Sequence, residues 1–87
     1  MEKIKNVQFT KLIKSADKLR EFNFRKSMGL EGPVMTVDVA DQYGGRHYLL
    51  YRLEEGNWVL KTQNMPPWIE EAIPEVDRAL KESVEMN

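Results

Sequence analysis

The stretch VMTVDVADQYGGRHYLLYRLEEGNWVLKTQ, residues 34–63, predicts three consecutive antiparallel strands. Apolar and polar side chains alternate within three runs, and this period of two is typical of a half-buried strand. The connections DQYGG and EEGN are short and contain glycine, which favours hairpin turns between the runs. The residues predicted to face the core are Met35, Val37, Val39, Leu49, Tyr51, Leu53, Trp58 and Leu60.

The preceding segment REFNFRKS, residues 20–27, alternates in the same way and predicts another strand before the turn-rich MGLEGP. Its two phenylalanines have two interpretations: an exposed platform for stacking nucleic-acid bases, or the buried half of a strand. A one-residue slip of register would expose the whole apolar set, and a buried Phe contributes about 2–3 kcal/mol. We therefore assign Phe22 and Phe24 to the core and predict that Asn23 and Arg25 face outward.

The segment PPWIEEAIPEVDRALKESVEMN, residues 66–87, predicts an amphipathic helix. Its apolar stripe comprises Ile69, Ile73, Val76, Leu80 and Val84. Pro74 cannot donate a hydrogen bond to the carbonyl of Glu70. The acidic turn PEVD favours a helix that restarts at Pro74, with residues 66–72 as a short preceding turn, and a kinked helix is the alternative.

The N-terminal segment has two readings. Phe9, Leu12, Ile13, Ala16 and Leu19 fit one face of a helix, whereas VQFTKLI is rich in strand formers and SADK can form a turn. We favour the helix and keep a fifth strand open. The predicted fold is thus one small α+β domain over residues 1–87: a four-stranded antiparallel meander packed against a C-terminal helix, with an N-terminal helix or extra strand.

Composition excludes several classes of chemistry. The chain has 87 residues, 41% of them hydrophobic, and no cysteine, which rules out disulfides, thiolate nucleophiles and cysteine-ligated metals. His47 is the only histidine, Ser15, Ser27 and Ser83 lie in different elements, and Gly44-Gly45 has the context of a hairpin turn. We expect no enzyme, no catalytic residue, no cofactor and no metal.

The apolar runs are too short for a signal peptide or a membrane span, so we expect a cytoplasmic protein without a membrane partner. Charge is unevenly distributed: residues 1–26 carry eight basic against three acidic side chains, and the other 61 residues carry five against eleven. Such asymmetry suits a nucleic-acid or acidic partner, or packing of the basic end near the acidic helix.

The face of the sheet opposite the core predicts a binding surface. Its candidate residues are Asn23, Arg25, Arg46, Tyr48, Arg52 and Lys61. A face that is partly basic and partly apolar can take a phosphate backbone, a peptide or a second copy of the chain; it can also be solvated, or covered by the N-terminal segment. Trp68, in NMPPWIEE, is a candidate interface anchor or a staple between helix and sheet.

These features predict a non-catalytic binding or assembly domain whose partner is another protein or its own copy, as in a homodimer. The alternative is single-stranded nucleic-acid binding, with Arg25, Arg46, Tyr48, Arg52 and Lys61 as contacts and the N-terminal lysines assisting.

Taken in order, FTKLIKSADKLREFNFRKS, TVDVADQYGGRHY, NWVL and MPPWI resemble the pattern of a family of small uncharacterised bacterial proteins. The resemblance covers most of the chain. It implies a bacterial cytosolic setting, and it implies no activity, ligand or site residue.

Overall fold

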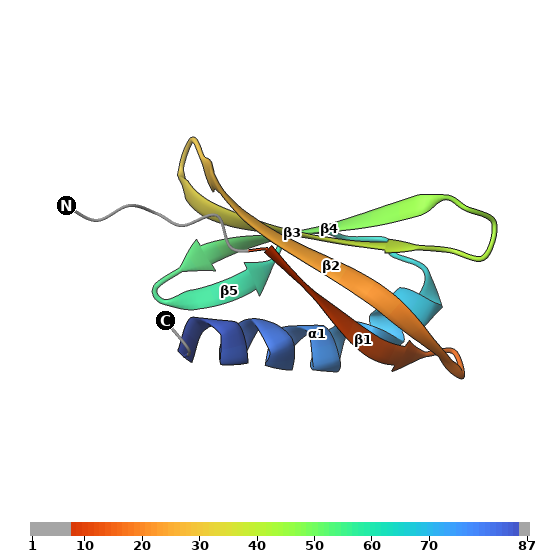
Figure 1. The fold of residues 1–87 in the computed structure, drawn as a ribbon. Coiled ribbons are helices and arrows are strands. Elements are labelled where there is room, and N and C mark those ends of the chain that lie inside the picture. The colour runs from red at the N-terminus through yellow and green to blue at the C-terminus, as the bar shows by residue number, and fades with distance from the viewer. Residues whose placement is uncertain (1–7, 86–87) are drawn as a thin grey trace.

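Five antiparallel strands and one helix make up the part of the chain that the computed structural model describes, residues 8–85 (Figure 1). The strands are β1 (Gln8–Ser15), β2 (Lys18–Gly29), β3 (Gly32–Ala40), β4 (Arg46–Glu54) and β5 (Asn57–Leu60). They form one sheet in the order β1-β2-β3-β4-β5, so that each strand pairs with its neighbour in sequence. Helix α1 (Pro67–Glu85) then crosses one face of the curled sheet and contacts both edge strands, β1 and β5.

Two-residue turns close the first and last hairpins. Ala16 and Asp17 have φ angles of 53° and 63°, and Glu55 and Gly56 have φ angles of 52° and 84°. Positive φ at both central positions is the mark of a type I′ turn, whose twist matches that of the flanking strands. The turns therefore set the register of both edge strands.

The core lies between the inner face of the sheet and α1. Its fully buried side chains are Phe22, Phe24, Met35, Val37, Val39, Leu49 and Tyr51 from the sheet, and Ile69, Ala72, Val76 and Leu80 from the helix. The predicted core assignment of Phe22 and Phe24 is confirmed. The ring of Phe9 also stacks on that of Phe24, with centroids 4.5 Å apart and an interplanar angle of 6°.

The N-terminal segment is a fifth strand, so the favoured helix and the count of four strands were wrong. Strand β1 pairs with β2 residue by residue, from Gln8 opposite Arg25 to Ser15 opposite Lys18. This pairing satisfies one edge of β2 and buries Ile13 against α1. The apolar residues of this segment fit both the 3.6-residue period of a helix and the two-residue period of a strand, so only the long-range pairing decides between the two.

The predicted helix restart at Pro74 was also wrong, because α1 runs without interruption through this residue. Pro74 and Glu70 both lie on the exposed side of the helix. The carbonyl that loses its donor therefore faces solvent, and water can satisfy it. The buried stripe continues through Val76, Ala79 and Leu80, whereas the side chain of Val84 lies outside the described residues.

Within residues 8–85, no helix has the length and apolar character that crossing a membrane requires.

A buried tyrosine ties the helix to the centre of the sheet. The hydroxyl of Tyr51 on β4 donates a 2.9 Å hydrogen bond to Asp77 Oδ1 on α1. Burial and the neighbouring carboxylate of Asp77 raise the pKa of Tyr51 far above its ordinary value of 10.0. Near pH 10, where the Tyr51 hydroxyl of the unfolded chain begins to ionise, the same hydroxyl in the folded chain therefore stays neutral.

We expect Tyr51→Phe to destabilise the fold by about 1–2 kcal/mol at pH 7, because the hydrogen bond to a carboxylate is lost. A raised folded-state pKa means stability that is complete below the unfolded pKa and is lost as pH rises above about 10. Urea unfolding at pH 7 and pH 11 should therefore show a stability loss at high pH that is larger in the wild type than in Tyr51→Phe. The matched control is Tyr43→Phe at the exposed β3–β4 hairpin; equal behaviour of the two variants would contradict the proposed tie.

Candidate functional site

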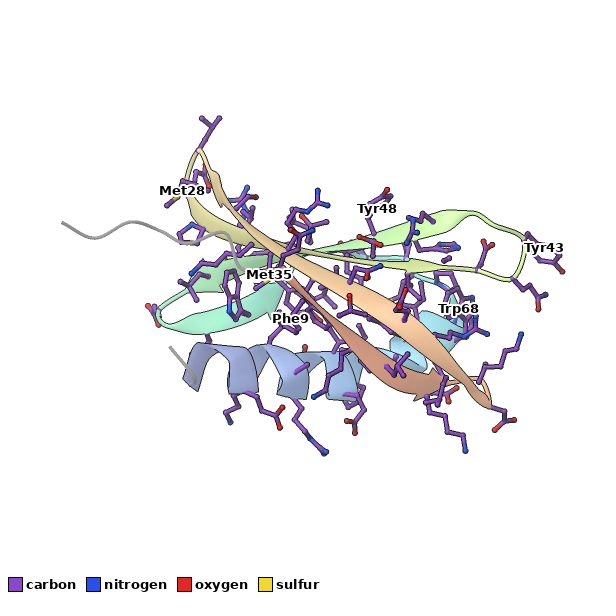
Figure 2. All side chains as sticks on the ribbon, in the orientation of Figure 1. Phe9, Met28, Met35, Tyr43, Tyr48 and Trp68 are labelled. Carbon is purple, nitrogen blue, oxygen red and sulfur yellow. The ribbon has the colours of Figure 1, made fainter. Side chains whose placement is uncertain are left out.

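The outer face of the sheet, opposite α1, carries all six predicted surface residues. Figure 2 shows Tyr48 pointing away from the helix. Strand pairing places the outer-face side chains in rows across the sheet. One row is Gln8, Arg25, Thr36 and Leu50; a second is Thr10, Asn23, Asp38 and Tyr48; a third is Ser27, Val34, Arg52 and Val59.

A hydrogen-bonded polar ladder crosses four strands on this face. Thr10 donates its hydroxyl to Asn23 Oδ1 at 2.8 Å, and Asn23 Nδ2 donates to Asp38 Oδ1 at 3.1 Å. Arg46 Nη1 donates to the same oxygen of Asp38 at 2.7 Å. The two predicted contacts Asn23 and Arg46 are thus held by intramolecular bonds, and a ligand would meet only their remaining N–H groups.

Three of the four cations predicted to contact a ligand already have carboxylate partners. Arg46 pairs with Asp38 and Lys61 Nζ pairs with Glu54 Oε2, both at 2.7 Å, and Arg52 pairs with Glu31. Arg25 makes no ion pair with any carboxylate whose side chain the structure describes, in residues 8–82. Exposed pairs such as these contribute about 0–1 kcal/mol, so they neutralise the surface more than they rigidify it.

The predicted residues fall into two groups. Asn23, Arg25, Arg46 and Tyr48 line one shallow groove, together with Gln8, Thr10 and Asp38. Arg52 and Lys61 do not line this groove: Arg52 lies in the third row, and the backbone N–H of Lys61 donates to the carbonyl of Leu50 on β4. The six residues therefore share a surface without forming one site.

Exposed apolar side chains are the feature of this face that sequence reasoning partly missed. Tyr48 is 61% exposed and Leu50 37%, while Leu12 and Leu19 are 62% and 68% exposed. Leu12 and Leu19 lie diagonally across the β1–β2 pair, since Leu12 is opposite Glu21 and Leu19 is opposite Lys14. Both leucines had been placed on the buried face of a helix. The alternation in VQFTKLI, read as a strand, would have turned Leu12 outward.

Trp68 lies at the joint between the sheet and the helix, half-buried and packed against the core. The guanidinium of Arg20 lies 4.4 Å from its ring centroid, and His47 meets the ring edge-on at 5.4 Å. Ser15 donates its hydroxyl to the carbonyl of Trp68. Trp68 thus staples α1 to the sheet, and its predicted use as an anchor for a partner remains a prediction.

The same corner holds a hydrogen-bonded carboxylate. Asp41 Oδ1 accepts the N–H groups of Tyr43 and Gly45 at 2.8 and 2.9 Å, and Asp41 Oδ2 lies 3.0 Å from His47 Nε2. A Cβ at Gly45 would come within 3.0 Å of Asp41 Oδ2, so glycine leaves room for the carboxylate. These hydrogen bonds, that to His47 first, lower the pKa of Asp41 below its ordinary 3.8.

Across residues 8–82, no three His, Asp or Glu side chains gather as metal ligands would. The His47–Asp41 pair lies within the β3–β4 hairpin, and His47 also packs against Trp68. These contacts indicate a structural role for the pair.

Comparisons with protein-family models, with curated proteins and with solved structures give no match to this chain. The resemblance to a family of small uncharacterised bacterial proteins therefore stays an expectation.

We expect Asp41→Asn to lower stability at pH 7, because the neutral amide is a weaker acceptor for His47 and for the two N–H groups. A lowered carboxyl pKa contributes stability that is present above the ordinary pKa and is lost as pH falls through the lowered one. Thermal unfolding should therefore show a difference between wild type and Asp41→Asn at pH 7 that shrinks towards about pH 2.

The matched control for Asp41→Asn is Glu55→Gln at the exposed β4–β5 turn, which should cost little at either pH. A constant difference between wild type and Asp41→Asn from pH 7 to low pH would show that the ionised carboxylate is not what stabilises the hairpin.

Proposed function

We propose that this chain is a non-catalytic assembly domain that self-associates through the outer face of its sheet. The observation that supports this most is the exposure of Leu12, Leu19, Tyr48 and Leu50 on the face that α1 does not cover. Leu12 and Leu19 are diagonal neighbours on β1 and β2, and Tyr48 and Leu50 lie two residues apart on β4. Exposed apolar groups of this kind on an uncovered face support a protein interaction surface.

The electrostatics of the face favour a protein over a polyanion. Interfaces commonly place apolar residues at the centre and satisfied polar groups at the rim. Here Leu50 lies between ion-paired neighbours: Arg52 two residues along its strand, and Lys61, whose N–H donates to the Leu50 carbonyl at 2.8 Å. A phosphate backbone would have to compete with Asp38, Glu31 and Glu54 for three of the four cations.

Single-stranded nucleic acid is the second candidate, and the observation that favours it is that Arg25 and Tyr48 line the same groove. A cation that has no carboxylate partner within residues 8–82, and an exposed ring in the same groove, are the minimal elements of a base-stacking site. One such element gives weak binding that falls steeply with salt, with a log–log slope near −0.7 per phosphate contacted.

The test is the mass of the chain against concentration, by sedimentation equilibrium over about 10–300 µM, the range in which weak interfaces form. We expect association that changes little between low and high salt, because apolar contacts are not screened. A variant with Leu12→Ser, Leu19→Ser, Tyr48→Ser and Leu50→Ser should associate at least ~10-fold more weakly, since each lost contact removes buried apolar area.

The matched control removes apolar surface elsewhere. Met28→Ser, Leu30→Ser and Tyr43→Ser change exposed residues at the β2–β3 and β3–β4 hairpins and should leave association unchanged. A monomer at every concentration would contradict the proposal. Binding of a labelled oligothymidylate or oligouridylate at low salt, lost in Arg25→Ala, would support the nucleic-acid candidate instead.

A further inference from the structure

Among residues 8–85, no strand pairs with the outer edge of β1, so this edge can accept another strand. It is eight residues long, contains no proline, and pairs with β2 in an unbroken one-to-one register. The opposite edge strand, β5, has only four residues. Long, regular edge strands are the ones that pair with another chain, whereas short ones are protected.

The backbone groups that point outward from β1 follow from the first turn. Ser15 and Lys18 flank a two-residue turn and therefore form a hydrogen-bonded pair. Hydrogen-bonded pairs alternate along an antiparallel ladder, so Ser15, Ile13, Lys11 and Phe9 bond to β2. The N–H and C=O groups of Gln8, Thr10, Leu12 and Lys14 are then directed to the free edge, and their side chains lie on the outer face.

Helix α1 lies beside this edge, and no backbone–backbone hydrogen bond joins it to β1 within residues 8–85. A groove runs between β1 and α1, lined by Lys11, Leu12, Ile13, Lys14, Glu75, Arg78, Ala79 and Glu82. The two elements lie side by side, with β1 as the outermost strand (Figure 1). The groove holds both signs of charge, including the Lys11–Glu82 pair at 3.8 Å, so a second copy meets no strong field of one sign.

We propose that two copies of the chain pair antiparallel along β1, with Leu12 opposite Leu12 of the second copy on the two-fold axis, and join their sheets into one. This inference rests on the proposed self-association and names the contact that produces it. The pairing would add roughly six backbone hydrogen bonds, from Thr10, Leu12 and Lys14 of both copies.

The side chains select this register over its neighbours. With Leu12 on the axis, Lys14 lies opposite Thr10 and Lys11 lies opposite Ile13 of the second copy. A shift that centres Lys11 would place two lysines directly opposite each other, which destabilises a strand pair. A shift that centres Ile13 would place Thr10 opposite Ala16, a turn residue with a φ of 53°, and so leave only roughly four bonds, those between Leu12 and Lys14 of the two copies.

The Leu12-centred register also accounts for the two exposed leucines on the outer face of the β1–β2 hairpin, Leu12 and Leu19. Leu19 is the diagonal neighbour of Leu12 within one chain. Pairing across the axis would therefore bring Leu19, Leu12 and the same two residues of the second copy into one diagonal line over four adjacent strands, with Glu21 directly opposite Leu12 in each chain. Diagonal neighbours on one sheet face are within reach of long side chains.

The first test introduces a charge at position 12, on the proposed two-fold axis. Leu12→Asp and Leu12→Lys each change a side chain that is 62% exposed, so the monomer should keep its fold, which circular dichroism checks. Each variant alone should dimerise at least ~10-fold more weakly than wild type, because like charges face each other. An equimolar mixture of the two should regain a dimer that contains one copy of each.

The second test uses the absence of cysteine from the chain. Leu12→Cys should form an intermolecular disulfide under mild oxidation, since paired residues have Cα atoms within the disulfide range of about 4.4–6.8 Å. Lys14→Cys is the matched control: two copies of it lie four residues apart along the strands, about 13 Å. Mixing Thr10→Cys with Lys14→Cys should form the mixed disulfide.

The outcomes separate this inference from the proposed function. A monomer at all concentrations overturns both. Association that survives Leu12→Asp but is lost in a Tyr48→Ser and Leu50→Ser variant overturns the β1 contact and leaves self-association through the outer face in place. Efficient crosslinking of Lys11→Cys in place of Leu12→Cys overturns the Leu12-centred register.

Discussion

The burial of alternate side chains of the sheet against α1 is the constraint on which the other features of this structure depend. Phe22, Phe24, Val37 and Leu49 are wholly removed from solvent, and Tyr51 adds a hydrogen bond to the helix. Because a strand has a period of two, burying one set of residues presents the other set on the outer face. The position of the helix thus defines both the core and the surface available for binding.

The outer face that results has two parts of different character. Across the middle, the polar side chains bond mostly to one another, through the ladder from Thr10 to Arg46 and the ion pairs of Arg52 and Lys61. At the β1 end, Leu12 and Leu19 are exposed beside the outer edge of β1, which no other strand of residues 8–85 pairs with. A surface that satisfies its own charges and leaves apolar groups exposed suits association with a protein, and pairing along β1 would place the exposed part at the contact.

Sequence patterns predicted the strands from Arg20 to Leu60 because their alternation is regular and glycine-bearing turns separate them. The N-terminal segment was misjudged because Phe9 and Ile13 fit both a helix and a strand, and only pairing with β2 distinguishes the two. Pro74 was misjudged for a related reason. A proline costs a helix little where the freed carbonyl faces water, and its orientation depends on which side of α1 is buried.

From Arg20 to Leu60 and along α1, the sequence by itself determined which residues face inward, since alternation and helical spacing are properties of neighbouring residues along the chain. It also placed all six candidate residues on one face of the sheet. Only the tertiary structure decided which cations are paired, which of the six share a groove, and which strands form the two edges of the sheet. Those outcomes depend on side chains that are distant in sequence, such as Arg52 and Glu31 or Asn23 and Asp38, and become neighbours only when the strands pair.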